Sequence, residues 1–199
     1  WFNFMKLWAV YENVIYRFVY GQKLTARLSI MEYAPPISQF LLQDLDKIQS
    51  ESKQNDIEYI VSMLKWFDRH KALNFENVKN CEYRENKNTI EFRCPNGTLE
   101  PVVWQNNVNL IVNLLLYCRN LKFDDDLIEK RRKLNQDIYD LGDIRQMLVL
   151  YEEVYLDQAL ELCDLLFANN YDKVYFLRQY LKSFEINEKP LVKAKKFIR

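Results

Sequence analysis

Glu91 and Arg93 are the residues of this chain whose types and spacing best suit chemistry on a small ligand. They lie in TIEFRC, residues 89–94, where polar and apolar residues alternate as on a β-strand. Because residues i and i+2 of a strand share a face, the spacing predicts two charges side by side, roughly 6–7 Å apart at their Cα atoms. A carboxylate there can bind Mg²⁺, and a guanidinium can bind phosphate or carboxylate oxygens. The alternative is a solvent-exposed ion pair on an edge strand, without a function.

The residues after this strand suggest how it is connected. PNGT predicts a tight reversal at Asn96-Gly97. Thr98 is expected to cap the next helix, which extends to about Arg119 and tolerates Pro101 in its first turn. The N-terminal amides of that helix would then face the end of the strand and join the carboxylate and the guanidinium. Since this helix is apolar on most sides, we expect it to be buried against a sheet and other helices.

Helical periodicity dominates the rest of the chain, because apolar residues recur at three- and four-residue steps. The expected helices cover Phe4–Tyr20, a segment capped by Ser38 that reaches Ile48, a segment capped by Asp56 that reaches Phe67, a segment after the acidic run 124–126, and residues 143–167 and 172–184. Between them, the helical period disappears from 70 to 94, and HKALNF, 70–75, is a second candidate strand. Trp8, Trp66 and Trp104 are expected in the core.

Composition sets broad limits on the class of protein. Its 28 Lys and Arg balance 28 Asp and Glu, so no whole-protein field attracts nucleic acid or anionic lipid. Only three glycines and five prolines occur, which favours helices over a many-turned sandwich or barrel. The four cysteines show no close metal-ligand spacing, so we expect no zinc site and favour a reducing, cytoplasmic setting. No apolar run is long enough for a transmembrane segment. The predicted class is α+β, predominantly helical, with a few antiparallel strands packed against helices.

Several segments together resemble the amidoligase family of the carboxylate-amine ligase superfamily, whose sheet is similar to that of glutamine synthetase. TIEFRCPNGTL resembles the family's strand-turn-helix signature, approximately EFR-x-x-x-GTL. Three earlier parts of the chain are similar to segments that precede this signature in the family. They are VIYRFVYG with the following Arg27, then YAPPI, and then HKALNF. LEPVVWQNNVNLIVNLLLYC is similar to the helix after it. The resemblance covers roughly residues 8–120 and implies that the strands belong to a glutamine synthetase-like sheet.

The resemblance implies an ATP-dependent ligase that joins a carboxylate to an amine, from small molecules or peptides, through an acyl phosphate and with Mg²⁺. Glu91 would then bind the metal. Arg93 would clamp phosphate or substrate, and Arg27 would be a second anion-binding group. The further nucleotide-binding positions that it implies are Gly97, Thr98 and Asn74.

The resemblance also implies parts that this chain lacks. The family's N-terminal half carries further metal carboxylates and has no counterpart here, and the chain begins at Trp1. We therefore expect residues 1–120 to be the C-terminal part of a catalytic domain whose missing half is its partner, and residues 121–199 to be a helical extension. His70 does not replace the missing ligands. An incomplete metal site and no ligase activity from this chain alone are expected.

A second hypothesis comes from another class of protein. The chain would be a mainly helical, non-enzymatic interaction domain in which Glu91 and Arg93 form a surface pair. A concave sheet surface that Glu91 and Arg93 face and that Arg27 also reaches favours the enzyme, whereas a convex, solvent-facing edge favours the interaction domain.

Overall fold

The computed structural model describes residues 1–20, 29–51, 59, 69–75, 77, 89–141 and 143–182. This part of the chain is predominantly helical with one small antiparallel sheet, so the predicted fold class is confirmed. The helices are α1 (Phe2–Tyr20), α2 (Ser29–Tyr33), α3 (Ser38–Ser50), α6 (Pro101–Cys118), α7 (Asp125–Leu134), α8 (Gln136–Tyr139), α9 (Ile144–Tyr151), α10 (Leu156–Leu166) and α11 (Asn170–Lys182).

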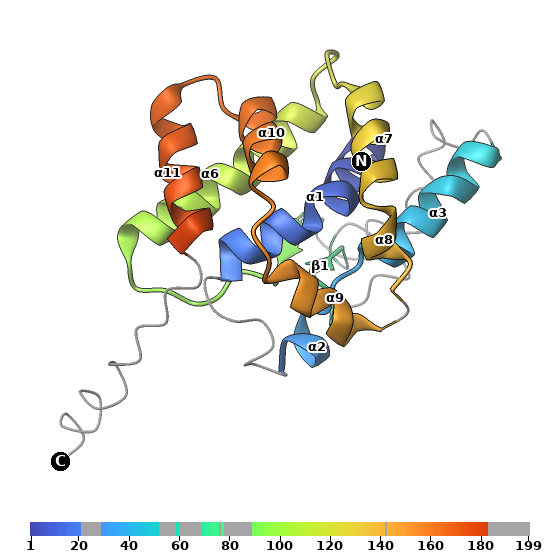
Figure 1. The fold of residues 1–199 in the computed structure, drawn as a ribbon, viewed down its shortest axis with the longest axis horizontal. Coiled ribbons are helices and arrows are strands. Elements are labelled where there is room, and N and C mark those ends of the chain that lie inside the picture. The colour runs from blue at the N-terminus through green and yellow to red at the C-terminus, as the bar shows by residue number, and fades with distance from the viewer. Residues whose placement is uncertain are drawn as a thin grey trace.

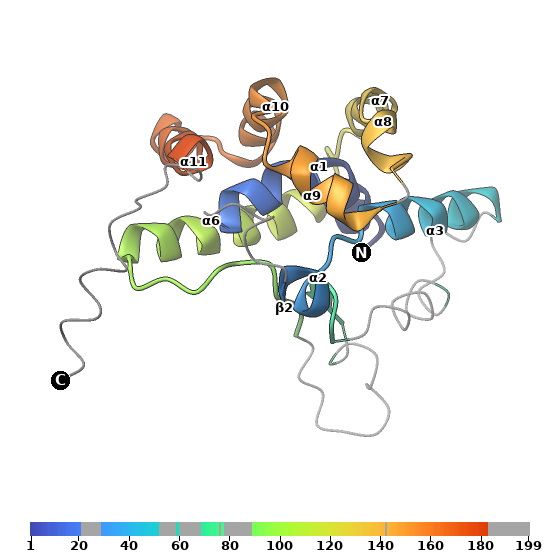
Figure 2. The same ribbon diagram turned by 60° about the horizontal axis from the view of Figure 1, so that its bottom comes forward.

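Helix α1 is the centre of the structure. Of the residues from Phe4 to Tyr20, all but Lys6 are buried. In Figures 1 and 2 the other long helices surround it, with α7, α10 and α11 side by side on one face and the sheet with α2 on the opposite side. Buried residues from Phe4 to Tyr180 form one hydrophobic cluster. Residues on either side of position 120 therefore share one core, so a boundary there does not separate two cores.

The sheet pairs β1 (Leu73–Asn74) with β2 (Glu91–Phe92) in the antiparallel register Leu73↔Phe92 and Asn74↔Glu91. Both predicted strand regions are confirmed, although each strand is short. The Phe92 ring packs edge-on against Phe4, with ring centroids 6.1 Å apart. Ile90 and Phe92 thus face the core while Glu91 is exposed, as the alternation predicts. This small sheet fixes the direction in which the charged face points.

Backbone hydrogen bonds extend the pairing beyond the two strands. The Arg93 N–H donates to the Ala72 carbonyl at 2.9 Å, and the Ala72 N–H donates to the Pro35 carbonyl at 3.3 Å. The proline-containing segment between α2 and α3 is thereby attached to β1. Residues far apart in the sequence meet here around the candidate site.

The helix predictions hold better in their centres than at their ends. The predicted 143–167 helix is two helices, α9 and α10, with a break between Tyr151 and Leu156. Thr98 does not cap α6, because that helix begins at Pro101 with Glu100 as its N-cap, and the Thr98 hydroxyl accepts instead from the Glu100 N–H at 3.1 Å. The predicted helix 56–67, with Trp66, and the residues after 182 lie outside the described residues apart from Tyr59.

Helix α6 is less buried than its composition predicts. Only Asn107, Leu110 and Leu114 are fully buried, and Trp104, expected in the core, is 59% exposed. A helix that is apolar on most sides does not indicate which side its neighbours cover, which is why both predictions are wrong. None of the helices in the described ranges combines the length and apolarity that crossing a membrane requires.

Candidate functional site

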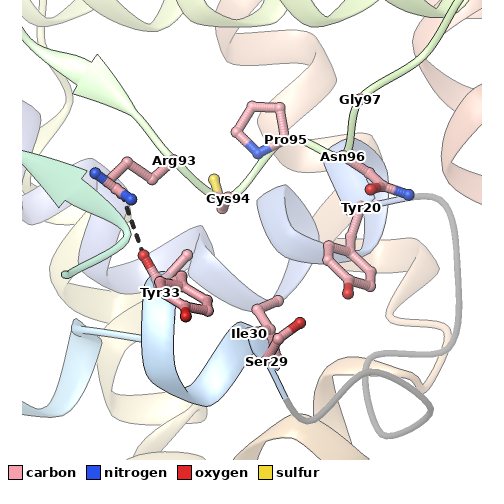
Figure 3. Close-up of a pocket in the computed structure, with 10 residues that line it drawn as sticks. Tyr20, Ser29, Ile30, Tyr33, Arg93, Cys94, Pro95, Asn96 and Gly97 are labelled. Atoms are coloured by element: carbon pink, nitrogen blue, oxygen red, sulfur yellow. Dashed lines mark hydrogen bonds between the residues drawn. The ribbon is translucent and has the colours of Figure 1, made fainter.

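A pocket of about 180 Å³ lies where the end of α1, helix α2 and the segment after β2 meet (Figure 3). Its lining residues are Tyr20, Ser29, Ile30, Tyr33, Ala34, Arg93, Cys94, Pro95, Asn96 and Gly97. In Figure 3, Arg93 and Tyr33 occupy one side of the pocket, and Tyr20 and Asn96 the other. Pockets for drug-sized ligands typically measure ~300–1,000 Å³. This one suits a small group, such as a carboxylate or a phosphoryl group, rather than a whole nucleotide.

Arg93 is the cationic group of the pocket. Its Nε donates to the Tyr33 carbonyl at 3.2 Å, across the pocket edge in Figure 3. Its Nη1 lies 3.4 Å from Glu91 Oε1. The Arg93 side chain is 24% exposed, so the guanidinium is partly withdrawn from water yet reachable. A guanidinium held in this way is positioned for an anion, because less side-chain entropy is lost when the anion binds.

Glu91 and Asn74 lie beside the pocket on the paired strands. Asn74 Nδ2 donates to Glu91 Oε2 at 3.0 Å, while Arg93 approaches the other carboxylate oxygen. The predicted shared face of Glu91 and Arg93 is therefore confirmed, and Asn74 joins it through the register of the sheet. Glu91 is 55% exposed and does not line the pocket. The site thus combines a pocket residue with a half-exposed carboxylate at its edge.

The segment after Arg93 differs from its prediction. Residues 96–100 form no turn, and Gly97 lines the pocket with nothing within 4 Å of where a Cβ would stand. The Asn96 N–H donates to the Val19 carbonyl at 3.1 Å, which ties this segment to the end of α1. Figures 1 and 2 show the chain running away from the sheet before α6 begins. The expected convergence of the α6 N-terminus on Glu91 is therefore absent, because three further residues separate Gly97 from the helix.

Three other residues considered from the sequence are not placed in the pocket. Arg27 lies outside the described residues. Thr98 is exposed less than the neighbouring Leu99 but lines no part of the pocket. His70 is exposed, with its Nε2 3.2 Å from Arg69 Nε, and its ring lies 6.4 Å from that of Tyr33. The expected nucleotide-binding role of Thr98 thus has no support from its position.

Helix α1 positions the pocket wall through residues that the sequence reasoning missed. The Tyr16 hydroxyl donates to the carbonyl of Ala34, a lining residue, at 2.7 Å. The Glu12 carboxylate accepts from the N–H groups of Ile37 and Ser38, both at 2.8 Å. These are the first amides of α3, so Glu12 caps that helix in place of the predicted Ser38. The available signal was the single acidic residue of a mostly apolar helix.

Burial governs the chemistry of the ionisable groups behind the pocket. Burial raises the pKa of Glu12, and the hydrogen bonds from Ile37, Trp8 and Ser38 oppose this shift. Burial also raises the pKa of the Cys94 thiol, and the nearby Glu12 carboxylate adds to the rise. Cys94 therefore stays protonated near neutral pH and is a poor nucleophile.

The described residues suit an anion better than a metal ion. Among them, no group of three His, Cys, Asp or Glu side chains is arranged to hold a metal. Glu91 offers carboxylate oxygens, but the neighbouring Arg93 already competes for them and repels a cation. Mg²⁺ can bind through one or two carboxylates when phosphates and waters supply its other ligands. These residues alone do not fit a complete Mg²⁺ site.

Comparison of the chain with protein-family models, with curated proteins and with solved structures finds no match. The site is therefore interpreted from its own geometry.

Proposed function

We propose that the pocket beside Arg93 binds the anionic group of a substrate in an ATP-dependent carboxylate-amine ligase of the amidoligase type. The observation that carries the proposal is a partly buried guanidinium on the wall of a pocket sized for one carboxylate or phosphoryl group. Further support comes from Glu91, which lies 3.4 Å from Arg93 Nη1, and from Asn74, which donates to Glu91, because the family resemblance implies a role for both residues. A cytoplasmic location, where ATP is available, is part of the proposal.

In such a reaction, the terminal phosphoryl group of ATP is transferred to the substrate carboxylate, and an amine then displaces phosphate to form the amide. The described residues contribute to binding and charge neutralisation. Arg93 would hold a carboxylate or phosphoryl oxygen and offset its negative charge as that charge is redistributed. Glu91 would orient Arg93, or contribute one oxygen to Mg²⁺ if further ligands come from ATP.

Binding of the small anions themselves tests the proposal. Inorganic phosphate, acetate and Mg²⁺-ATP would each be titrated calorimetrically into the wild-type chain, Arg93→Ala and Arg178→Ala. Arg178 is exposed on α11 and lines no part of the pocket, so it controls for the loss of one positive charge. We expect weak binding of at least one anion, with Kd of about 1 mM, and a loss of about tenfold or more in Arg93→Ala only.

Three outcomes would contradict parts of this proposal. Equal binding by wild type and Arg93→Ala would remove the pocket from consideration as an anion site. Tight, stoichiometric binding of Mg²⁺-ATP would contradict the incomplete metal site, and formation of a hydroxamate from ATP, a carboxylate and hydroxylamine would show that this chain alone is a ligase.

The second candidate function is an interaction domain without catalysis. The observation that favours it is the exposed apolar surface of α6, which the ligase hypothesis does not use. Retained anion binding at Arg93 would argue against this candidate as the sole function, because a purely structural ion pair has no need of a ligand.

A further inference from the structure

Helix α6 presents an outward face without a single charged residue. No Asp, Glu, Lys or Arg occurs in its 18 residues. Asn107, Leu110 and Leu114 point to the core, so Gln105, Val108 and Val112, at a three- and then a four-residue step, point the other way. Val112 is 45% exposed, and Leu116 beside it is 57% exposed. Spacing of this kind is typical of a helix that packs against another helix.

The polar residues on this face are amides rather than charges. Gln105 Nε2 donates to Asn109 Oδ1 at 2.9 Å, and Asn113 Nδ2 donates to the Asn109 carbonyl at 2.8 Å. Each amide side chain carries both donors and acceptors, so an identical face can satisfy it. Four apolar residues of α6, Val102, Trp104, Val112 and Leu116, are 45–59% exposed, and apolar surface gathered in this way commonly marks an interface.

The charged residues at the two ends of α6 have opposite signs. Glu100 is the N-cap and Arg119 the C-cap, and both are exposed. If two copies of the helix paired in parallel, these ends would set like charges together. If they paired antiparallel, each Glu100 would meet the Arg119 of the other copy. The residues of α6 between Glu100 and Arg119 are uncharged, so they cause no charge repulsion in either arrangement. The charges at the two ends therefore favour the antiparallel arrangement.

We propose that two copies of this chain associate through their α6 helices, packed antiparallel about a two-fold axis near the middle of the helix. This arrangement sets Val108 of one copy against Val112 of the other and Glu100 next to Arg119 at both ends. It is isologous, because the same surface serves both partners. An 18-residue helix is about 27 Å long, so this pair lies at the small end of the range for stable interfaces. The dimer is therefore concentration-dependent.

The dimer is tested by sedimentation equilibrium over a wide concentration range, with variants that introduce opposite charges on α6. Val112→Glu and Val108→Lys each place a charge against an apolar partner, and we expect each to weaken dimerisation about tenfold or more. An equimolar mixture of the two variants sets the introduced carboxylate of one chain against the introduced ammonium group of the other, and we expect it to restore the dimer. Val149→Glu on α9, at a residue 52% exposed, is the matched control and should dimerise as wild type does.

The orientation has its own test. Arg119→Glu should weaken the dimer, and the double variant Glu100→Lys with Arg119→Glu should recover it, because the exchanged ends attract again. Far-UV circular dichroism confirms that each variant is folded. A wild-type chain that stays monomeric at all concentrations overturns the proposal, as does dissociation by Val149→Glu to the same extent as by Val112→Glu. Failure of the mixture to recover the dimer overturns the antiparallel register.

Discussion

The carboxylate of Glu12 is completely buried and is surrounded by donors. Trp8 Nε1 and the Ile37 N–H donate to Oε1, and the Ser38 N–H and the Tyr151 hydroxyl donate to Oε2. Each oxygen thus has two partners, and three of the four bonds join α1 to the start of α3 and to α9. A buried carboxylate is tolerated only when it is satisfied in this way. These hydrogen bonds therefore hold the Glu12 side chain in one position behind the candidate pocket.

Glu12→Gln should destabilise the chain by about 2 kcal/mol or more, because the amide nitrogen would face two donors and leave them unpaired. Chemical denaturation monitored by circular dichroism measures the free energy of unfolding. Glu129→Gln on the partly exposed face of α7 serves as the control, with an expected loss below about 0.5 kcal/mol. Equal stability of the two variants would indicate that Glu12 carries no such role.

At the scale of elements, Arg131 joins α7 to α10, and Glu161 in turn joins α10 to α1. Its Nε and Nη2 donate to the two oxygens of Glu161 at 2.8 and 3.0 Å, and its Nη1 donates to Asp157 at 2.8 Å, both on α10. The Tyr11 hydroxyl of α1 donates to Glu161 Oε1 at 2.6 Å. Burial works to raise the pKa of Glu161, but the hydrogen bonds from Arg131 and Tyr11 and the charge of Arg131 outweigh it and lower the pKa.

This shift predicts a pH dependence of stability. Because the pKa of Glu161 is lower in the folded chain, the unfolded chain binds more protons in acid, so the stabilisation is complete above pH ~4.5 and is lost as the pH falls through the folded pKa. Thermal melting from pH 6 to pH 3 should show a shallower acid loss for Glu161→Gln than for wild type. Asp137→Asn, at an exposed position, should keep the wild-type slope. The opposite shift of Glu12 is common to all three chains and cancels in the comparison.

Local sequence patterns predicted most helices and strands, but they did not predict which other parts of the chain contact them. Periodicity located α1, α3, α6 and α11, since it depends only on residues within one turn of one another. Caps from elsewhere in the chain could not be predicted, and so the role of Glu12 at α3 was missed. The alternation of residues 89–94 placed Glu91 and Arg93 on one face, but it could not show that the following segment leaves the sheet. The pocket depends on contacts among α1, α2 and this segment, which no local pattern contains.

At the scale of the whole molecule, one core includes elements from both ends of the described chain. The Arg17 Nε of α1 donates to the Tyr180 carbonyl of α11 at 3.2 Å, and the Phe18 and Phe176 rings stack with centroids 4.6 Å apart. Asn135 and Gln158 form a buried amide pair that also contacts Asn13. The helices after residue 120 are therefore part of what stabilises α1.

A shared core predicts a single cooperative unfolding transition. All four tryptophans precede residue 120, so tryptophan fluorescence reports on that part of the chain, whereas far-UV circular dichroism also reports on α7 to α11. We expect urea transitions followed by the two signals to coincide in midpoint and slope. Separate midpoints would indicate that the helices after residue 120 unfold independently.

The burial of α1 has a consequence for how the protein is made in the cell. The partners Arg17 and Tyr180 are separated by 163 positions. At translation rates of roughly 5–20 residues per second, about 8 to 30 s pass between the synthesis of α1 and that of its last covering helix. During this interval α1 lacks part of its native cover, because α3 and α6 are made before the helices that complete its burial, so we expect the nascent chain to bind chaperones that recognise exposed apolar segments.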